Sequence, residues 1–306
     1  MKVTVLTGGV GGAKLVLGLA HALPTGDVTA IVNTGDDFTH LGLRVSPDID
    51  TLLYTLSGKA NTAQGWGREG ESWSFMAAVR SLGGEDWFAL GDGDLALHVL
   101  RTARLAAGER LSAIIADFAR RWGIESRILP MSDDPVATIV ETDEGVLAFQ
   151  RYFVARRCEP RVKAIRFDGA ATASPAPGVL AAIETADTIL IAPSNPFLSI
   201  DPLLAVPGMR EALAGSRAPV VAISPLVGGQ AVKGPTGKLM AELGADHGVA
   251  AIAAHYRGVI DAMLIDERDP ATELAIASAR HDTLMLTIED RVRVARAALD
   301  LARKLG

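Results

Sequence analysis

The sequence predicts an α/β protein: a Rossmann-like, three-layer α/β/α fold on a mostly parallel sheet, with an inserted helical subdomain. Short, uniformly apolar runs recur along the chain, which is typical of strands covered by helices on both faces. The first run leads into a glycine turn and then a segment with helical apolar spacing, as in a βα unit. Residues 72–121 carry helical patterns and no strand signal.

The first fifty-six residues predict two parallel strands and two helices. Residues 2–6 (KVTVL) and 28–32 (VTAIV) are strand-like runs, and residues 15–23 have helical spacing. Residues 48–56 (DIDTLLYTL) predict a second helix with acids in its first turn.

The middle of the chain predicts consecutive helices, at residues 72–82, 90–102 after a glycine turn, and 111–122. Because no strand interrupts them, we divide the chain in two. Residues 1–70 and 123–306 are expected to form the Rossmann-like nucleotide- and phosphate-binding domain, and residues 71–122 the helical insertion.

Strand signals return beyond residue 123, and the turn TDEG at residues 142–145 is expected to join two of the strands. Strands are expected at residues 127–131, 137–141, 145–152, 162–167, 188–192, 218–225, 250–253, 262–265 and 285–288. Helices are expected at residues 179–186, 238–243 and 290–305.

Composition excludes several classes of protein. The 306 residues are 49% hydrophobic, 22% charged and 5% aromatic, which is usual for a globular α/β chain. The net charge of −6 argues against a nucleic-acid partner. No apolar stretch reaches about 18 residues and no signal peptide is seen, so we expect no membrane partner and a cytoplasmic location. The single Cys158 allows no internal disulfide.

Four predicted strands end in polar turns, at residues 7–14, 33–37, 193–196 and 227–235. Ligands of open parallel sheets bind beyond the carboxyl ends of the strands. The sequence therefore predicts one site assembled from these turns.

The first turn, TGGVGGAK, fits the dinucleotide-binding fingerprint only in part. Gly9 and Gly11 supply G-x-G, but Lys14 stands where the third Gly or Ala belongs. Glycines here still let a phosphate approach backbone N–H groups and a helix N-terminus. We expect a diphosphate at Gly9, Gly11, Gly12 and Lys14; the alternative is a tight βα turn without a ligand.

Four carboxylates, Asp36, Asp37, Asp48 and Asp50, follow the second strand within fifteen residues. Carboxylate and phosphate oxygens are ligands that Mg²⁺ prefers, so the cluster indicates a magnesium site. The alternative is structural, with Asp48 and Asp50 as helix caps and Asp36 in a turn.

Two later turns offer donors for anions. Ser194 and Asn195 in PSNP can bind a phosphate or a base, and Gly228, Gly229 and Lys233 in VGGQAVKGP form another anion-binding mixture. A proline-flanked structural turn is the alternative for PSNP. No Ser–His–Asp or Cys–His pattern is present, so covalent catalysis is not expected.

Seven segments, in this order, make the chain resemble the 2-phospho-L-lactate transferase family of coenzyme F420 biosynthesis over nearly its whole length. They are GGVGGAK, NTGDD, SPDIDTLLYTL, LGDGDLALHVLRT, ILPMSDDPV, APSNPFLSI and ISPLVGGQAVKGPTGKLM. The resemblance implies an Mg²⁺-dependent transferase. It would move a phospholactyl- or phosphoenolpyruvyl-type group from a guanosine-diphosphate-activated donor to the 5-deazaflavin Fo and release GMP. It also implies a homodimer.

The resemblance also implies roles for individual residues. Asp37 and Asp50 would be catalytic, and Asp37, Asp48 and Asp50 would bind Mg²⁺. The nucleotide part of the donor would contact Gly9, Gly11, Gly12, Lys14, Asn33, Ser194, Asn195, Gly228, Gly229 and Lys233. The acceptor would contact Asp50, Asp92, Asp94, Arg101 and Trp66.

The acceptor side departs from the family pattern at Gly93. Several relatives have Arg between the two acids of LGD-x-D, so Arg101 or Arg68 is expected to replace it here. Trp66 and Trp87 are candidates for an apolar slot.

Two rival functions are weighed against the transferase. A sugar-nucleotide-binding regulator of the gluconeogenesis-factor type shares the glycine turn and N-x-x-D-D, but SPDIDT and GGQAVKGP argue against it. A nicotinamide-dependent dehydrogenase would place Asp36 on the ribose, but the missing third glycine argues against it. The sequence does not choose among phospholactate, phosphoenolpyruvate and phosphoglycerate.

Overall fold

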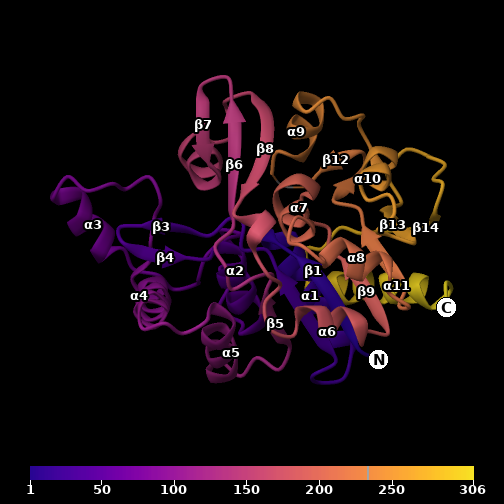
Figure 1. The fold of residues 1–306 in the computed structure, drawn as a ribbon, viewed down its shortest axis with the longest axis horizontal. Coiled ribbons are helices and arrows are strands. Elements are labelled where there is room, and N and C mark those ends of the chain that lie inside the picture. Colours follow the sequence, from indigo (N-terminus) through magenta and orange to yellow (C-terminus); the bar gives the residue numbers. More distant parts are fainter. Residues whose placement is uncertain (233) are drawn as a thin grey trace.

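The computed structural model describes residues 1–232 and 234–306. Its centre is a seven-stranded sheet with the order β14-β13-β10-β9-β1-β2-β5 (Figure 1). Neighbouring strands all pair in parallel. The strands are β1 (Val3–Thr7), β2 (Val28–Val32), β5 (Arg127–Pro130), β9 (Thr188–Ile191), β10 (Val220–Ile223), β13 (Ala262–Asp266) and β14 (Ala277–His281). The predicted Rossmann-like α/β fold is confirmed.

Helices cover both faces of this sheet, and the strands divide their apolar side chains between the faces. Val3 and Val5 of β1 belong to one core cluster, whereas Leu6 belongs to the other, as the two-residue period of a strand requires. The first cluster includes α1 (Gly9–Ala22), α2 (Pro47–Leu56), α5 (Leu111–Arg121) and α11 (Ile288–Arg303). The second includes α6 (Val179–Glu184), α7 (Asp201–Leu204), α8 (Met209–Ala214), α9 (Thr236–Glu242) and α10 (Val249–His255).

Smaller units extend from this central body. An antiparallel sheet holds β6 (Ala137–Thr142), β7 (Gly145–Ala148) and β8 (Val162–Asp168). Two hairpins pair β3 (Phe38–His40) with β4 (Leu43–Val45) and β11 (Leu226–Val227) with β12 (Gln230–Ala231). α3 (Ser74–Ser81) and α4 (Asp92–Ala106) lie at the left of Figure 1, with α3 outermost.

Side-chain packing in residues 71–122 is shared with the rest of the chain. α5 contributes to the core on one face of the central sheet. A separate small cluster of Val45, Met76 and Leu90 lies between the β3–β4 hairpin and α3. The division of the chain at residues 71 and 122 stays a prediction.

Two predicted strands are wrong. Residues 250–253 lie in α10, where Val249 and Ile252 are buried at helical spacing among alanines, which favour helix. Residues 285–287 lie in a loop, and Ile288 is the first residue of α11, which starts with a capping box of Thr287 and Asp290. The edge strand is instead β14, which is largely exposed and lacked an apolar signal.

Two further boundaries differ from expectation. α1 begins at Gly9, so the glycines form its first turn and do not precede it. The strand expected at residues 145–152 ends at Ala148, and a π-helical turn follows at Arg151–Ala155.

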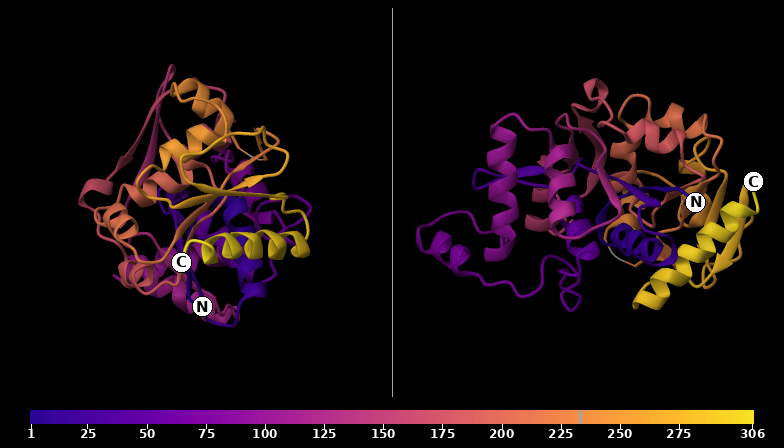
Figure 2. Two further views of the ribbon diagram at one scale, coloured as in Figure 1. Left: turned by 90° about the vertical axis from the view of Figure 1, so that its right-hand side faces the viewer. Right: turned by 90° about the horizontal axis from the view of Figure 1, so that it is seen from below.

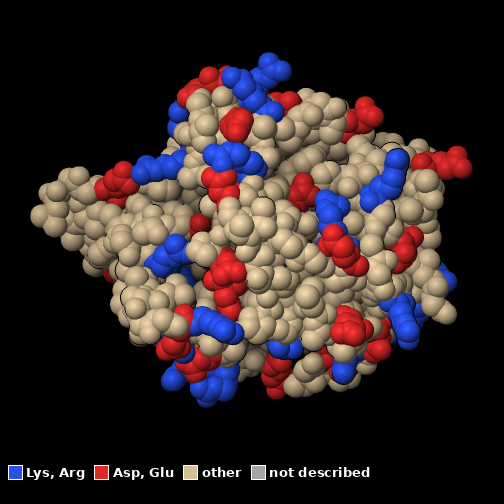
Figure 3. Space-filling view, in the orientation of Figure 1, with Lys and Arg blue, Asp and Glu red and all other residues tan. Residues whose placement is uncertain are grey.

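Charged side chains of both signs are mixed on the surface. Basic and acidic side chains are interspersed over the face shown in Figure 3. None of the helices in the described part of the chain combines the length and apolar character needed to cross a membrane.

The contact between α1 and α11 depends on one glycine. The two helices lie side by side (Figure 2), and a Cβ on Gly18 would overlap the carbonyl group of Arg291. Gly18→Ala is therefore expected to lower the free energy of unfolding by about 1–3 kcal/mol in urea denaturation. Gly237→Ala is the control, because a Cβ there meets nothing within 4 Å; equal losses in both variants would contradict the expectation.

Candidate active site

The polar turns meet at the point where the strand order reverses. From β1 the chain continues outward through β2 to β5 and then returns to β9 on the other side of β1. The crevice at the carboxyl ends of β1 and β9 is therefore the switch point at which ligands of such sheets bind.

Gly9 borders open space at this switch point. It has a φ of 67°, and a Cβ built on it would meet nothing within 4 Å. Its N–H donates to Asp48 Oδ1 at 2.8 Å. A ligand can therefore approach the first turn of α1 here.

Gly11 and Gly12 have a different role, which is to allow close packing. A Cβ on Gly11 would lie 2.7 Å from the carbonyl oxygen of Pro193, and one on Gly12 would overlap the side chain of Thr7. These two glycines bring the turn after β9 against the start of α1.

Asn33, at the end of β2, links three segments of the site. It is fully buried. Its Nδ2 donates to Asp48 Oδ2 at 3.0 Å and to the carbonyl of Leu198 at 3.3 Å, and its Oδ1 accepts from Gly35 N. Asn33 thus lies at the predicted place, with its amide occupied by protein groups.

Ser194 and Asn195 fasten the turn that follows β9. Ser194 Oγ donates to the carbonyl of Gly8 at 2.7 Å. Asn195 Oδ1 accepts from the N–H groups of Phe197 and Leu198, and its Nδ2 donates to Thr236 Oγ1 in α9. Both residues lie at the switch point, and both shape it.

Asp36 is buried and Asp37 is half-buried, and the charge of both carboxylates is incompletely compensated. Oδ1 of each has no hydrogen-bond partner within the described residues, whereas Asp37 Oδ2 accepts from Ser46 Oγ at 2.6 Å. Burial raises the pKa of Asp37 to about 7. Burial and the neighbouring Asp48 raise the pKa of Asp36 well above its usual value.

Asp48 shares this environment, but both of its oxygens are occupied. Burial raises its pKa to about 6, against hydrogen bonds from Asn33 and Gly9 that lower it. Three acids that resist ionisation together at one sheet edge indicate a place for a cation.

Asp50 is held by a buried arginine. Arg101, on α4, is completely buried, and its two terminal nitrogens each contact one oxygen of Asp50 on α2. Ser46 N also approaches Asp50 Oδ2, at 3.4 Å. Because Ser46 also contacts Asp37, Asp37 and Asp50 lie on either side of one residue.

A pocket of about 180 Å³ opens beyond this pair. Its lining includes Trp66, Trp73, Arg68, Glu71 and Asp94. Asp94 Oδ1 accepts from the hydroxyl of Tyr54 on α2. Trp66 is 51% exposed, and the pocket lining combines two indole rings with the carboxylate of Asp94.

Arg68 enters this pocket because position 93 is a glycine. A Cβ on Gly93 would overlap the guanidinium of Arg68, and a Cβ on Gly91 would overlap Glu71. Arg68 Nη1 pairs with Glu71 Oε1 at 3.1 Å, and Glu71 Oε2 accepts from Gly93 N at 2.6 Å. Arg68 therefore occupies the space that a side chain at position 93 would fill.

Two other residues predicted to contact the acceptor, Asp92 and Trp87, make contacts elsewhere in the structure. Asp92 accepts from the N–H groups of Ser74 and Phe75 and so caps α3. Trp87 packs against His40 under the guanidinium of Arg151, which lies 4.2 Å from its ring centre. Trp87 does not line the pocket that contains Trp66.

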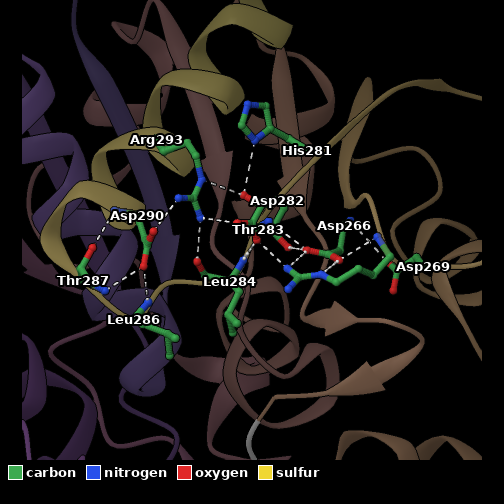
Figure 4. A network of polar contacts seen from close by, with 11 residues as sticks. Asp266, Asp269, His281, Asp282, Thr283, Leu284, Leu286, Thr287, Asp290 and Arg293 are labelled. Carbon is green, nitrogen blue, oxygen red and sulfur yellow. Dashed lines mark hydrogen bonds and ion pairs between the residues drawn. The ribbon is translucent and has the colours of Figure 1, made fainter.

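Gly228 and Gly229 form the turn of the β11–β12 hairpin, both with positive φ as a two-residue hairpin turn requires. Gly229 N donates to Asp269 Oδ1 at 2.7 Å. Figure 4 shows the polar network that contains Asp269. Asp266 at the end of β13 accepts from the backbone N–H and hydroxyl of Thr283, which fixes the loop before α11.

Lys14 contacts that same loop. Its Nζ donates to the carbonyl of Met285 at 2.7 Å, so α1 and the loop between β14 and α11 support each other. Lys233, also predicted to bind the nucleotide, lies outside the described residues.

Asp36 and Asp37 are the acids whose chemistry suits a metal ion. Asp36 and Asp37 each offer an unpartnered buried oxygen, and both have the carboxylate chemistry that Mg²⁺ prefers. Residues 1–232 and 234–306 contain no group of three or more His, Cys, Asp or Glu positioned to hold a metal. An ion here would therefore need water and phosphate oxygens as its other ligands, which is usual for Mg²⁺.

The structure brings together Gly9, Asp37, Asp48 and Asp50, and joins them to Asp94 through α4. Their assignment to catalysis, metal or substrate stays a prediction. Tyr54, Glu71 and His98 were missing from the predicted site. Only His98 had a signal, because it stands four residues after Asp94 on a predicted helix.

The chain is similar to known proteins over its full length. Residues 3–302 match a family described as "2-phospho-L-lactate transferase CofD". A phosphoenolpyruvate transferase of Streptomyces griseus is 45% identical over 100% of this chain and 99% of that protein. A 2-phospho-L-lactate transferase of Methanosarcina mazei is 39% identical over 93% of this chain and 95% of that protein.

A solved structure supports the fold. Protein BH3568 of Bacillus halodurans superposes with a TM-score of 0.66 at 19% identity, covering 97% of this chain and 99% of that one. A second structure of BH3568, described as a member of the UPF0052 family, gives a TM-score of 0.62 at 17% identity over 98% and 100% of the two chains.

The burial of Asp37 predicts a pH-dependent stability. The pKa of Asp37 is raised from 3.8 to about 7. The contribution of its protonated form to the free energy of unfolding is therefore complete below about pH 4 and is lost as the pH rises through 7. At pH 8 the free energy of unfolding of Asp37→Asn is expected to be about 1–3 kcal/mol higher than that of wild type. At pH 5 this difference should be smaller. Urea denaturation at both pH values measures this.

Asp300→Asn is the control for that experiment, because Asp300 is exposed. It is expected to change stability by less than about 0.5 kcal/mol at either pH. An Asp37→Asn protein that is less stable than wild type at pH 8 would contradict the burial argument.

Proposed function

The chain belongs to the 2-phospho-L-lactate transferase CofD family, and from this premise we propose that it moves a phospho-acid from a guanosine-diphosphate-activated donor to the ribityl hydroxyl of the 5-deazaflavin Fo. GMP is the second product, and the step belongs to coenzyme F420 biosynthesis. One observation carries the proposal. A buried polar chain from Asp50 through Arg101 and His98 to Asp94 joins the switch point to an aromatic pocket. A group transfer needs two such adjoining sites.

The donor diphosphate is assigned to the open space beside Gly9. The N-terminus of α1 lies there, and its backbone dipoles favour an anion. The hairpin turn at Gly228 and Gly229, fastened by Asp269, would border the guanosine side.

Mg²⁺ is assigned to Asp37 and Asp36, with Asp48 and Asp50 beside them. Bound there, the ion would neutralise phosphate charge and orient the phosphate oxygens. It would also compensate the buried carboxylates, whose pKa values are raised in the protein alone.

The protein's own groups would act mainly by positioning, which supplies most of the catalysis in phosphoryl transfer. Arg101 fixes both oxygens of Asp50, so this carboxylate can hold the acceptor hydroxyl in one orientation. Trp66 and Trp73 give the flat deazaflavin ring an apolar wall, and Asp94 and Arg68 offer its polar edge an acceptor and a donor.

The phosphoenolpyruvyl donor is favoured over the phospholactyl donor. Five relatives that are 40–45% identical are named phosphoenolpyruvate transferases, whereas the two Methanosarcina 2-phospho-L-lactate transferases are 39% identical. Family membership favours a transferase over the sugar-nucleotide-binding regulator and the dehydrogenase. Homodimer assembly and a cytoplasmic location stay predictions.

A direct test incubates the purified protein with Mg²⁺, Fo and each guanylated donor in turn. We expect the phosphoenolpyruvyl donor to give GMP and an Fo adduct of matching mass, at a kcat/KM at least about tenfold above that of the phospholactyl donor. Mass spectrometry reads the products. Preference for the phospholactyl donor would reverse the donor assignment, and no adduct from any donor would overturn the proposed function.

Magnesium binding has a readout that needs no substrate. Mg²⁺ is expected to raise the melting temperature by about 2–4 °C at pH 8, and by less at pH 5.5, where Asp37, with a pKa of about 7, is protonated. Asp37→Asn should lose most of the increase. NaCl of matched ionic strength is the control, and an unchanged increase in Asp37→Asn would remove Asp37 from the metal site.

A further inference from the structure

His98 lies between the two halves of the site and has no role in the proposal above beyond its place in the polar chain. Its side chain is 1% exposed. On α4 it stands four residues after Asp94 and three before Arg101, so all three side chains lie on one face of the helix. A buried imidazole among charged groups is costly unless those groups engage it.

The contacts of His98 assign its proton. Arg101 Nη1 can only donate, and it lies 3.4 Å from His98 Nδ1. Nδ1 is therefore the acceptor, and Nε2 carries the hydrogen. Asp50 Oδ2 lies farther from Nδ1, at 3.7 Å.

The Nε2 side faces Asp94, which lines the aromatic pocket. Nε2 lies 3.2 Å from Asp94 Oδ2, yet it makes no aligned hydrogen bond to any described residue. Asp94 Oδ1 is already held by the hydroxyl of Tyr54. Oδ1 of Asp94 is thus fixed by Tyr54, whereas Oδ2 lies beside His98 Nε2 without an aligned hydrogen bond.

This arrangement is typical of a contact that tightens when ligand binds. A donor group of a ligand in the pocket that engages Asp94 would orient its carboxylate, and Oδ2 would then align with the Nε2 hydrogen. Arg101 would transmit the constraint to Asp50, because Arg101 contacts both His98 and Asp50.

We propose that His98 is a positioning residue for the acceptor, fixing the Asp94 carboxylate in the aromatic pocket and tying it to the Asp50–Arg101 pair. The inference rests on the proposed function, in which this pocket receives the acceptor. His98 touches neither substrate and exchanges no proton with them. It makes acceptor binding and the geometry of Asp50 interdependent.

Three variants test this role. His98→Phe keeps the buried ring volume and removes both nitrogens, whereas His98→Gln keeps an amide donor that can reach Asp94. Thr102→Val is the matched control, because Thr102 lies one turn further on α4 and contacts only backbone groups.

The readouts are KM for Fo, KM for the guanylated donor, and Kd for Fo without donor, measured by deazaflavin fluorescence. His98→Phe is expected to raise KM and Kd for Fo about tenfold and to leave KM for the donor within about twofold. His98→Gln should recover most of the affinity, and Thr102→Val should change neither KM by more than about twofold.

Tyr54→Phe provides a second measurement if His98→Phe does not fold. It removes the other donor to Asp94 and is expected to raise KM for Fo selectively. An equal rise of both KM values, or no recovery in His98→Gln, would overturn the positioning role. If wild type transfers to Fo but KM and Kd for Fo are unchanged in His98→Phe, only the positioning role is overturned. If wild type transfers nothing to Fo, the proposed function is overturned as well.

Discussion

The buried pair of Asp50 and Arg101 is the interaction on which the site depends most. Arg101 is completely shielded from water, so its charge must be compensated by protein groups. Asp50 supplies both oxygens to it. Removing either partner would leave the other charge buried and unpaired, at a cost of about 3–5 kcal/mol. The pair also joins α2 of the central domain to α4, so the position of α4 and the geometry of the site are set together.

The remaining acids at this sheet edge are difficult to ionise together. Asp36, Asp37 and Asp48 all have raised pKa values caused first by burial. Three such groups oppose ionisation together, and stability is given up to hold them there. The proposed cation, bound beside these carboxylates, would compensate this cost.

The glycines of the first turn divide into two physical classes. Gly11 and Gly12 are required by packing, because a Cβ would overlap Pro193 or Thr7. Gly9 borders open space and has a positive φ, so its constraint is conformational and its surroundings are accessible. Gly93, in the first turn of α4, makes a third case, because the guanidinium of Arg68 occupies the space that a side chain there would fill.

The sequence alone determined the α/β class, the turns that meet at the switch point and the family. Each is encoded locally: a two-residue or helical period, glycines next to a strand, acids next to a strand end. The wrong strand at residues 250–253 falls where a short apolar run fits either a strand or a helix. The one at residues 285–288 falls where a capping box begins α11. Tertiary structure alone decided that Arg101 faces Asp50, that Arg68 fills the space above Gly93, and that His98 connects the two halves of the site. These contacts join residues from different helices and loops, and their partners are chosen by packing and by the need to pair buried charge, which no local spacing records.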